Sequence, residues 1–260
     1  MDTPAPAVEP SATPPCHRAL LLATLSLGGF AIGTSEFSAM GLMPDMVEDF
    51  GVTAPQVGHL ISGYALGVVV GAPLLAIIGG RLPRRTLLLA LMGFYVLGNL
   101  ASALAPDHGA MLLARFVAGL PHGAYFGVAA LTAVAISPPQ ARGKAISLVM
   151  LGLTLAVLLG NPLATWMGQA IGWRWAFVLV SVVALATVVL LACFMPRGEA
   201  PAPTRAGDEL RAFNRLPVWQ ALLIGAIGFA GMFCVFAYLA PTMLKVTGVS
   251  AAWIPLGLAG

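Results

Sequence analysis

The chain alternates between long apolar stretches and short polar connections, and this alternation limits its possible folds more than any other feature. Seven stretches of roughly 20 mainly apolar residues follow one another, and an eighth begins near Ile254. A helix of that length crosses the hydrocarbon core of a bilayer and satisfies its own backbone hydrogen bonds there. The pattern therefore predicts an all-α polytopic membrane protein, with spans near residues 19–43, 57–79, 86–105, 110–136, 145–170, 175–195 and 217–240.

The composition argues against several other classes of protein. Charged residues make up 9% of the chain and hydrophobic residues 59%, whereas soluble domains carry about 25% charged residues. A net charge of +3 on so apolar a chain does not make the basic patch of a nucleic-acid-binding protein. The three cysteines are scattered, and the sequence has no phosphate-binding loop, zinc motif or nucleophile elbow. We therefore expect no enzyme activity, cofactor, metal or nucleic-acid partner.

Basic residues gather on one side of the predicted spans, and this asymmetry predicts the orientation of the chain. Cytoplasmic loops of membrane proteins are enriched in Lys and Arg, so we expect the N-terminus in the cytoplasm. Residues 1–17 are rich in Pro and Ala and lack the basic start of a signal peptide, which predicts a flexible cytoplasmic tail. Residues 197–216 are expected to form a cytoplasmic linker. The basic residues on this side are Arg18, Arg81, Arg84, Arg85, Arg142, Lys144, Arg197, Arg205, Arg211 and Arg215.

Two internal matches indicate repeats. The stretch from Gly63 to Pro73 aligns with the stretch from Gly152 to Pro162, and the two lie in spans of opposite direction, as in a 3+3 inverted repeat. Residues 44–53 align with residues 241–250 after spans of the same direction, as in two parallel six-helix halves. Together they predict a six-helix N-terminal half at 18–196 and the start of a second half at 217–260.

The second alignment also places the last residue. Gly260 corresponds to Gly63, a few residues into the second helix of a half. We therefore expect the chain to be a truncated version of a twelve-helix protein, lacking most of its C-terminal half. The alternative is a genuine half-length protein.

Three stretches carry a resemblance to a known family. They are GTSEFSAMGLMP at residues 33–44, LARFVAGLPHG at 113–123, and the stretch from Gly152 through Gly160-Asn161-Pro162 to Trp175. With them the chain resembles the major facilitator superfamily, and more narrowly its bacterial drug/sugar efflux group of proton antiporters. The loop after the second span departs from the family pattern, because Gly80 and Pro83 replace an acidic residue and a glycine.

The resemblance implies a secondary active transporter of the bacterial inner membrane. Its expected partners are the lipid bilayer, protons and a small organic solute such as a sugar, nucleoside or drug, which would leave the cell in exchange for protons. The alternative is a truncated membrane remnant or assembly partner that does not transport.

Glu36 and Arg115 are the two charged residues inside predicted spans, and both lie about 12 Å below the same membrane boundary. Charges inside the membrane are costly, which favours a functional role. The pair either exchanges a proton as substrate binds or locks two helices together. His122 lies two helical turns from Arg115 on nearly the same face, where it is either a proton relay or a packing residue.

Other candidates depend more heavily on the resemblance. Asn161, Tyr64 and Tyr125 are candidates for the substrate cavity, while Arg81, Arg84 and Arg85 either gate the transporter or anchor it by their positive charge. Small residues four positions apart allow helices to approach closely, and proline inside a helix predicts a kink or hinge. The packing and hinge positions are Gly63, Gly67, Gly71, Pro73, Gly119, Gly123, Gly127, Gly152, Gly160 and Pro162.

Overall fold

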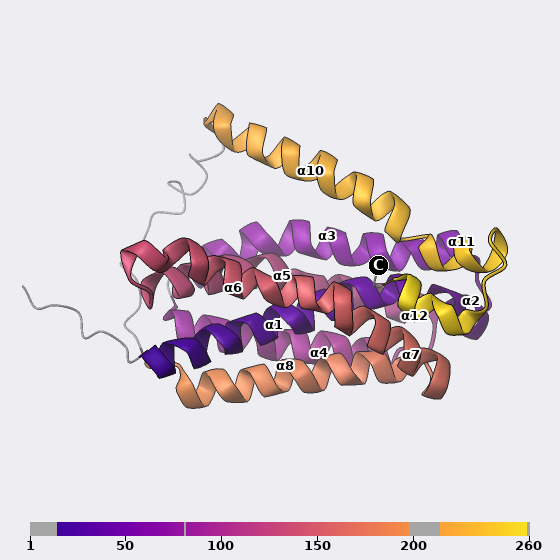
Figure 1. The fold of residues 1–260 in the computed structure, drawn as a ribbon, viewed down its shortest axis with the longest axis horizontal. Coiled ribbons are helices and arrows are strands. Elements are labelled where there is room, and N and C mark those ends of the chain that lie inside the picture. The colour runs from indigo at the N-terminus through magenta and orange to yellow at the C-terminus, as the bar shows by residue number, and fades with distance from the viewer. Residues whose placement is uncertain (1–14, 81, 198–213, 259–260) are drawn as a thin grey trace, which may run out of the picture.

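The structure is a computed structural model that describes residues 15–80, 82–197 and 214–258, and this part of the chain is helical apart from short connections (Figure 1). Seven of its helices are long and apolar enough to cross a membrane, so the protein is a multi-pass membrane protein as predicted. Single helices form five spans: α1 (Pro15–Gly41), α3 (Ala54–Gly79), α4 (Arg84–Ala103), α5 (His108–Ala135) and α8 (Arg174–Phe194).

The remaining spans are composite. The fifth consists of η1 (Pro139–Ala141), α6 (Arg142–Leu155), the π-helical turn η2 (Ala156–Gly160) and α7 (Asn161–Ile171), and the seventh of α10 (Leu216–Phe236) and α11 (Leu239–Lys245). Shorter helices are α2 (Met43–Phe50), η4 (Ala251–Trp253) and α12 (Ile254–Gly257).

The expected spans agree with these helices to within a few residues, with two differences. Helix α1 already begins at Pro15, so residues 15–17 of the expected tail are helical. The seventh span was expected as one helix to residue 240, but α10 ends at Phe236 and α11 follows as a separate helix. Residues 1–14 of the tail and 198–213 of the linker lie outside the described residues.

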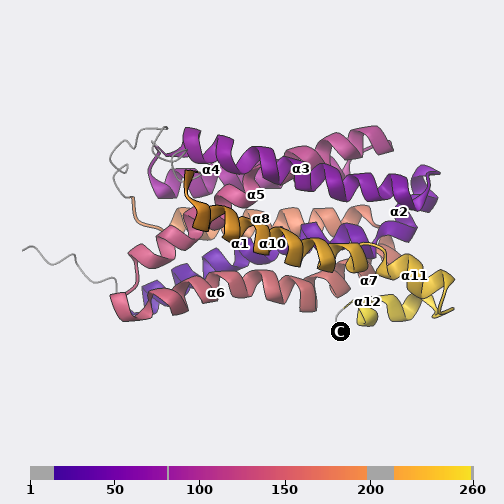
Figure 2. The ribbon, with the colours of Figure 1, turned by 90° about the horizontal axis from the view of Figure 1, so that it is seen from above.

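The first six spans pack with the symmetry of the predicted inverted repeat. Helix α3, the second span of the first three, packs along α5, the first span of the second three. In the same way α6, η2 and α7, the second span of the second three, pack along α1. Helix α4 packs against α5 and α8. Each group of three spans, a triplet, thus packs its second span against the other triplet, and this exchange joins the two triplets into one bundle (Figure 2).

Glycine makes the closest of these approaches possible. A methyl group on Gly67 would meet the carbonyl oxygen of Phe116, and one on Gly119 would meet that of Tyr64. The matching stripe on the fifth span faces α1, where a methyl on Gly152 would meet the carbonyl oxygen of Ser26. Gly127 was predicted to belong to a packing stripe, but among the described residues nothing lies within 4 Å of the position its Cβ would take.

Prolines inside the spans include Pro73 in α3, Pro121 in α5 and Pro162 in α7. Pro73 lies inside α3, which continues through it. Pro162 lies in the first turn of α7, directly after the π-helical turn η2. A proline lacks the N–H that an α-helix needs at that position, and a wider turn accommodates the unpaired carbonyl groups. The kink predicted at Pro162 therefore takes the form of a π-helical turn before it.

The start of the second half repeats the turn that follows the first span. Gly51, which ends α2, has φ of 64°, and Gly248, at the aligned position after α11, has φ of 65°. Both are left-handed conformations, which glycine adopts without steric cost. The alignment of residues 44–53 with 241–250 thus has a conformational counterpart.

Helix α10 touches the bundle near one end and diverges from it toward the other (Figure 1). Near α11 the rings of Phe233 and Phe236 lie 5.7 Å from the ring of Phe37 in α1. At the other end, α1 and α4 begin and α8 ends, as His17 and Arg85 show by their bonds to carbonyl oxygens of Phe194 and Ala192. We call this the basic end, because Arg18, Arg84, Arg142 and Lys144 lie there, and the end with α2 and α11 the opposite end.

Candidate functional site

Arg115 is completely buried in the middle of the bundle, on α5. Its Nη1 donates a hydrogen bond of 2.9 Å to Ser35 Oγ on α1, and Ser35 Oγ donates in turn to Asn99 Oδ1 on α4 at 2.5 Å. The guanidinium carbon lies 4.3 Å from the centre of the Tyr64 ring and 5.6 Å from that of Phe177. Four helices therefore surround one charge, and the Tyr64 ring face attracts it. Nε and Nη2 make no hydrogen bond to a described residue.

The hydroxyl group of Tyr64 extends this network toward the basic end. It lies 3.0 Å from Nδ1 of His122 and 3.3 Å from the hydroxyl of Tyr95, which donates to the carbonyl oxygen of Ile32 at 3.2 Å. Because the Tyr64 hydroxyl has one proton, it donates either to His122 or to Tyr95. If His122 Nδ1 carries a proton and donates it to Tyr64, the chain of hydrogen bonds runs unbroken to Ile32. The protonation of His122 therefore sets the direction of these bonds.

Glu36 lies next to this network without joining it. It is the one residue of 31–40 that is not buried, and its carboxylate makes no hydrogen bond or ion pair to a described residue. The ion pair considered from the sequence is not formed, because Arg115 binds Ser35 instead. Glu36 also lies directly before Phe37, where α10 meets α1.

A second polar cluster lies between α1 and α7, beside the π-helical turn. Both side-chain atoms of Asn161 and the hydroxyl of Thr34 are buried without a hydrogen-bond partner among the described residues. A methyl on Gly160 would meet Thr34 Oγ1, which places Thr34 against this turn. Buried amides are nearly always paired, so this cluster can accept a water molecule or a polar ligand.

Other residues predicted for the site have structural contacts. Tyr125 is fully buried and donates to the carbonyl oxygen of Leu25 at 2.8 Å, which ties α5 to α1. Arg85 donates to the carbonyl oxygen of Ala192 at 2.5 Å in the last turn of α8, where a cation stabilises the helix dipole. Arg84 is exposed and makes no hydrogen bond or ion pair to a described residue, and Arg81 lies outside the described part of the chain.

Three residues that hydrogen-bond in the network, Ser35, Tyr95 and Asn99, were not among the site residues predicted from the sequence. A usable signal was present, because Tyr95 and Asn99 are polar residues four positions apart on one face of an apolar span. Ser35 gives no such signal, since serine is common in membrane helices and bonds to its own helix.

Arg174 also does more than the interfacial anchoring that its tryptophan neighbours indicate. It forms an ion pair of 2.7 Å with Asp49 of α2 and a hydrogen bond of 3.2 Å to the carbonyl oxygen of Ala105. Trp173 Nε1 donates to the same Asp49 oxygen at 3.2 Å. These contacts fasten α2, the α4–α5 connection and the start of α8 at the opposite end.

A known protein family matches the part of the chain that contains the whole site. The model of the Major Facilitator Superfamily matches residues 25–260, which include every residue of the Arg115 network. The chain belongs to the Major Facilitator Superfamily. Its helical fold and the family resemblance read from residues 33–44, 113–123 and 152–175 are thereby confirmed.

Curated transport proteins match most of this chain. It is 38% identical over 233 residues to the inner membrane transport protein YdhP of Escherichia coli (strain K12), a match that covers 90% of this chain and 60% of YdhP. It is 29% identical over 234 residues to the "Probable sugar efflux transporter" of Pasteurella multocida (strain Pm70), a match that covers 87% of this chain and 56% of that protein.

A solved structure of a bacterial homolog of the human lysosomal transporter Spinster, inward-facing and unoccupied, matches with a TM-score of 0.76. The match has 18% identity and covers 95% of this chain and 60% of that chain, and it shows the fold. The chain spans about 60% of the length of YdhP and of this structure.

Proposed function

We propose that residues 18–196 form the N-terminal half of a proton-coupled exporter of a small organic solute, and that residues 217–260 form the start of its second half. The membrane is the bacterial inner membrane, and the basic end with the N-terminus faces the cytoplasm. The named relatives, an inner membrane transport protein and a sugar efflux transporter, support this proposal. The excess of Arg and Lys at the basic end supports the orientation.

One observation carries the proposal of proton coupling. Glu36 is a carboxylate inside a span, partly buried at the edge of the Arg115 network and unpaired within the described residues. A carboxylate in this position can take up a proton from one side and release it to the other. Nε and Nη2 of Arg115, which have no partner among the described residues, can attract Glu36 or an anionic group of the solute.

Around this pair, the other predicted residues take supporting roles. The hydrogen-bond chain through Tyr64 and His122 provides a relay toward the basic end. Asn161 offers unpaired polar atoms to a solute, while Tyr125 and the glycine pairs hold the helices in register. Arg84 and Arg85, with Arg81, belong to the loop that gates the basic end.

The test is solute-driven proton movement in everted vesicles that contain the full-length protein. Glu36→Gln keeps the size and polarity of the side chain but cannot ionise, so solute export should no longer depend on the proton gradient. Glu48→Gln, an acidic residue of α2 outside the spans, is the matched control and should leave coupling intact. Undiminished coupling in Glu36→Gln would refute the assigned role.

A further inference from the structure

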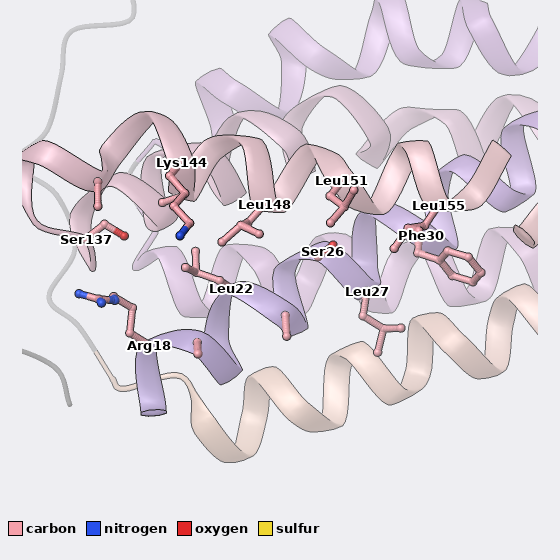
Figure 3. Close-up of a pocket in the computed structure, with 14 residues that line it drawn as sticks. Arg18, Leu22, Ser26, Leu27, Phe30, Ser137, Lys144, Leu148, Leu151 and Leu155 are labelled. Atoms are coloured by element: carbon pink, nitrogen blue, oxygen red, sulfur yellow. The ribbon is translucent and has the colours of Figure 1, made fainter. Parts of the chain in front are cut away.

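A cavity of about 740 Å³ lies between α1 and α6 at the basic end (Figure 3). Its walls are almost entirely apolar and include Leu22, Leu27 and Phe30 from α1 and Leu148, Leu151 and Leu155 from α6. Its polar groups are few: Figure 3 shows Arg18, Lys144 and Ser137 at one end, the mouth, and Ser26 further along the groove. The cavity is therefore amphipathic along its length.

The dimensions of the cavity match one leaflet of a bilayer. From Arg18 to Phe30 the wall on α1 covers twelve residues, or about 18 Å of helix, and from Lys144 to Leu155 the wall on α6 covers about 16 Å. A bilayer has a hydrocarbon core of about 30 Å, so one leaflet contributes roughly 15 Å. An acyl chain of the leaflet at the basic end can lie along these walls with its headgroup level with the two cations.

The charges at the mouth need an anion that the described part of the chain does not supply. Neither Arg18 nor Lys144 makes a hydrogen bond or ion pair to a described residue, and the described acidic residues lie in the opposite half of the bundle. Both cations stand in the first turns of their helices, α1 and α6, whose positive dipole ends repel them. Helix α6 also begins without a side-chain cap. A phosphate at this mouth would meet two cations and two helix N-termini at once.

We propose that the groove between α1 and α6 binds one anionic phospholipid from the leaflet at the basic end. Its phosphate lies between Arg18 and Lys144, and one acyl chain lies along the leucines of α1 and α6. The site is separate from the Arg115 network and does not depend on the proposed transport activity. Anionic lipids are attracted by basic residues at the membrane surface, whereas a zwitterionic lipid gains little from them.

The proposal can be tested on the full-length protein by native mass spectrometry. The protein is purified in detergent with equal amounts of phosphatidylglycerol and phosphatidylcholine that carry identical acyl chains. We expect phosphatidylglycerol to be retained in preference. Arg18→Gln/Lys144→Gln should weaken its retention about 30-fold, at roughly fivefold for each basic residue, while Arg18→Lys/Lys144→Arg should restore it.

Two further variants separate the groove from general charge effects. Arg142→Gln/Arg197→Gln removes two positive charges from the same end but none from the cavity lining, and it should retain phosphatidylglycerol like the wild type. Ala23→Trp fills the groove and should reduce retention of both lipids. Circular dichroism and size-exclusion profiles like those of the wild type would show that each variant is folded.

Several results would overturn the proposal. Equal retention of both lipids by the wild type would mean that the two cations at the mouth do not select an anionic headgroup. Wild-type retention by Arg18→Gln/Lys144→Gln or by Ala23→Trp would place the lipid elsewhere. Displacement of phosphatidylglycerol by millimolar glycerol 3-phosphate, which has no acyl chain, would identify the ligand as a free anion.

Discussion

At the scale of single residues, the costliest feature of the molecule is the charge of Arg115 in the middle of an apolar bundle. An ion in such an interior is stable only when polar groups replace its water. Here Ser35 accepts a hydrogen bond and the faces of Tyr64 and Phe177 supply negative potential. No carboxylate neutralises the guanidinium at ion-pair distance within the described residues. Aromatic faces and one hydroxyl hold the charge, and two of its donor groups stay free.

Substitutions of Tyr64 can separate the stabilisation that its ring gives to Arg115 from the stabilisation that its hydroxyl gives through hydrogen bonds, because the ring and the hydroxyl contact different residues. Tyr64→Phe removes the hydrogen bonds to Tyr95 and His122 and should lower the free energy of unfolding by about 1 kcal/mol. Tyr64→Leu also removes the ring under Arg115 and should cost about 2 kcal/mol more. Thermal unfolding in detergent measures both, with Tyr238→Phe, a half-exposed tyrosine, as the control. A Tyr64→Leu variant no less stable than Tyr64→Phe would contradict this account of the charge.

At the scale of helices, the exchange of the second spans between the two triplets governs the architecture. Because α3 lies along α5 and the fifth span lies along α1, neither triplet is closed without the other. The stripes of small residues occur on these exchanged helices, and they let backbones approach to contact distance. The π-helical turn before Pro162 belongs to the same interface, since it carries Gly160 against Thr34 of α1.

The glycines of α5 provide a matched pair of substitutions on one helix. Gly119→Ala places a methyl against the backbone carbonyl of Tyr64, which cannot rotate away, so α3 and α5 must separate. We expect a loss of about 1–3 kcal/mol in unfolding free energy. Gly127→Ala places the same methyl in open space and should be neutral or stabilising by up to about 1 kcal/mol. Melting temperatures in detergent compare the two variants. An equal loss of stability in Gly119→Ala and Gly127→Ala would contradict the role of close packing at Gly119.

At the scale of the whole molecule, the described chain is joined at the opposite end and spread at the basic end. At the opposite end, Phe37 of α1 packs against Phe233 and Phe236 of α10, and Gln169 donates to the carbonyl oxygen of Ala251 at 2.9 Å. Toward the basic end α10 leaves the bundle (Figure 1). The described α10 accordingly has no buried residue.

A cross-link across the aromatic contact tests whether this end must open. In the full-length protein with its native cysteines replaced by serine, Phe37→Cys/Phe233→Cys should be linked readily by a short thiol reagent. We expect the link to stop solute exchange and its reduction to restore it, because alternating access requires the closed end to part. Ala19→Cys/Leu222→Cys, near the spread end, should be linked poorly. Full exchange by the linked protein would mean that this contact is not part of a gate.

The sequence by itself determined the spans, the sidedness of the basic residues, the repeats and the family. These follow from composition and periodicity, because lipid admits long apolar helices and charges collect at their ends. It also placed His122 two turns from Arg115 on one helix, since the rise of a helix is constant.

Only the tertiary structure decided which of these residues meet. Periodicity fixes the depth of a side chain and its face, but the rotation of each helix depends on how its neighbours pack. For this reason Arg115 lies against Ser35 and Tyr64 rather than Glu36, and Gly127 faces open space although Gly119 and Gly123 face α3. The groove beneath Arg18 and Lys144 exists for the same reason, because its two walls come from helices far apart in the sequence.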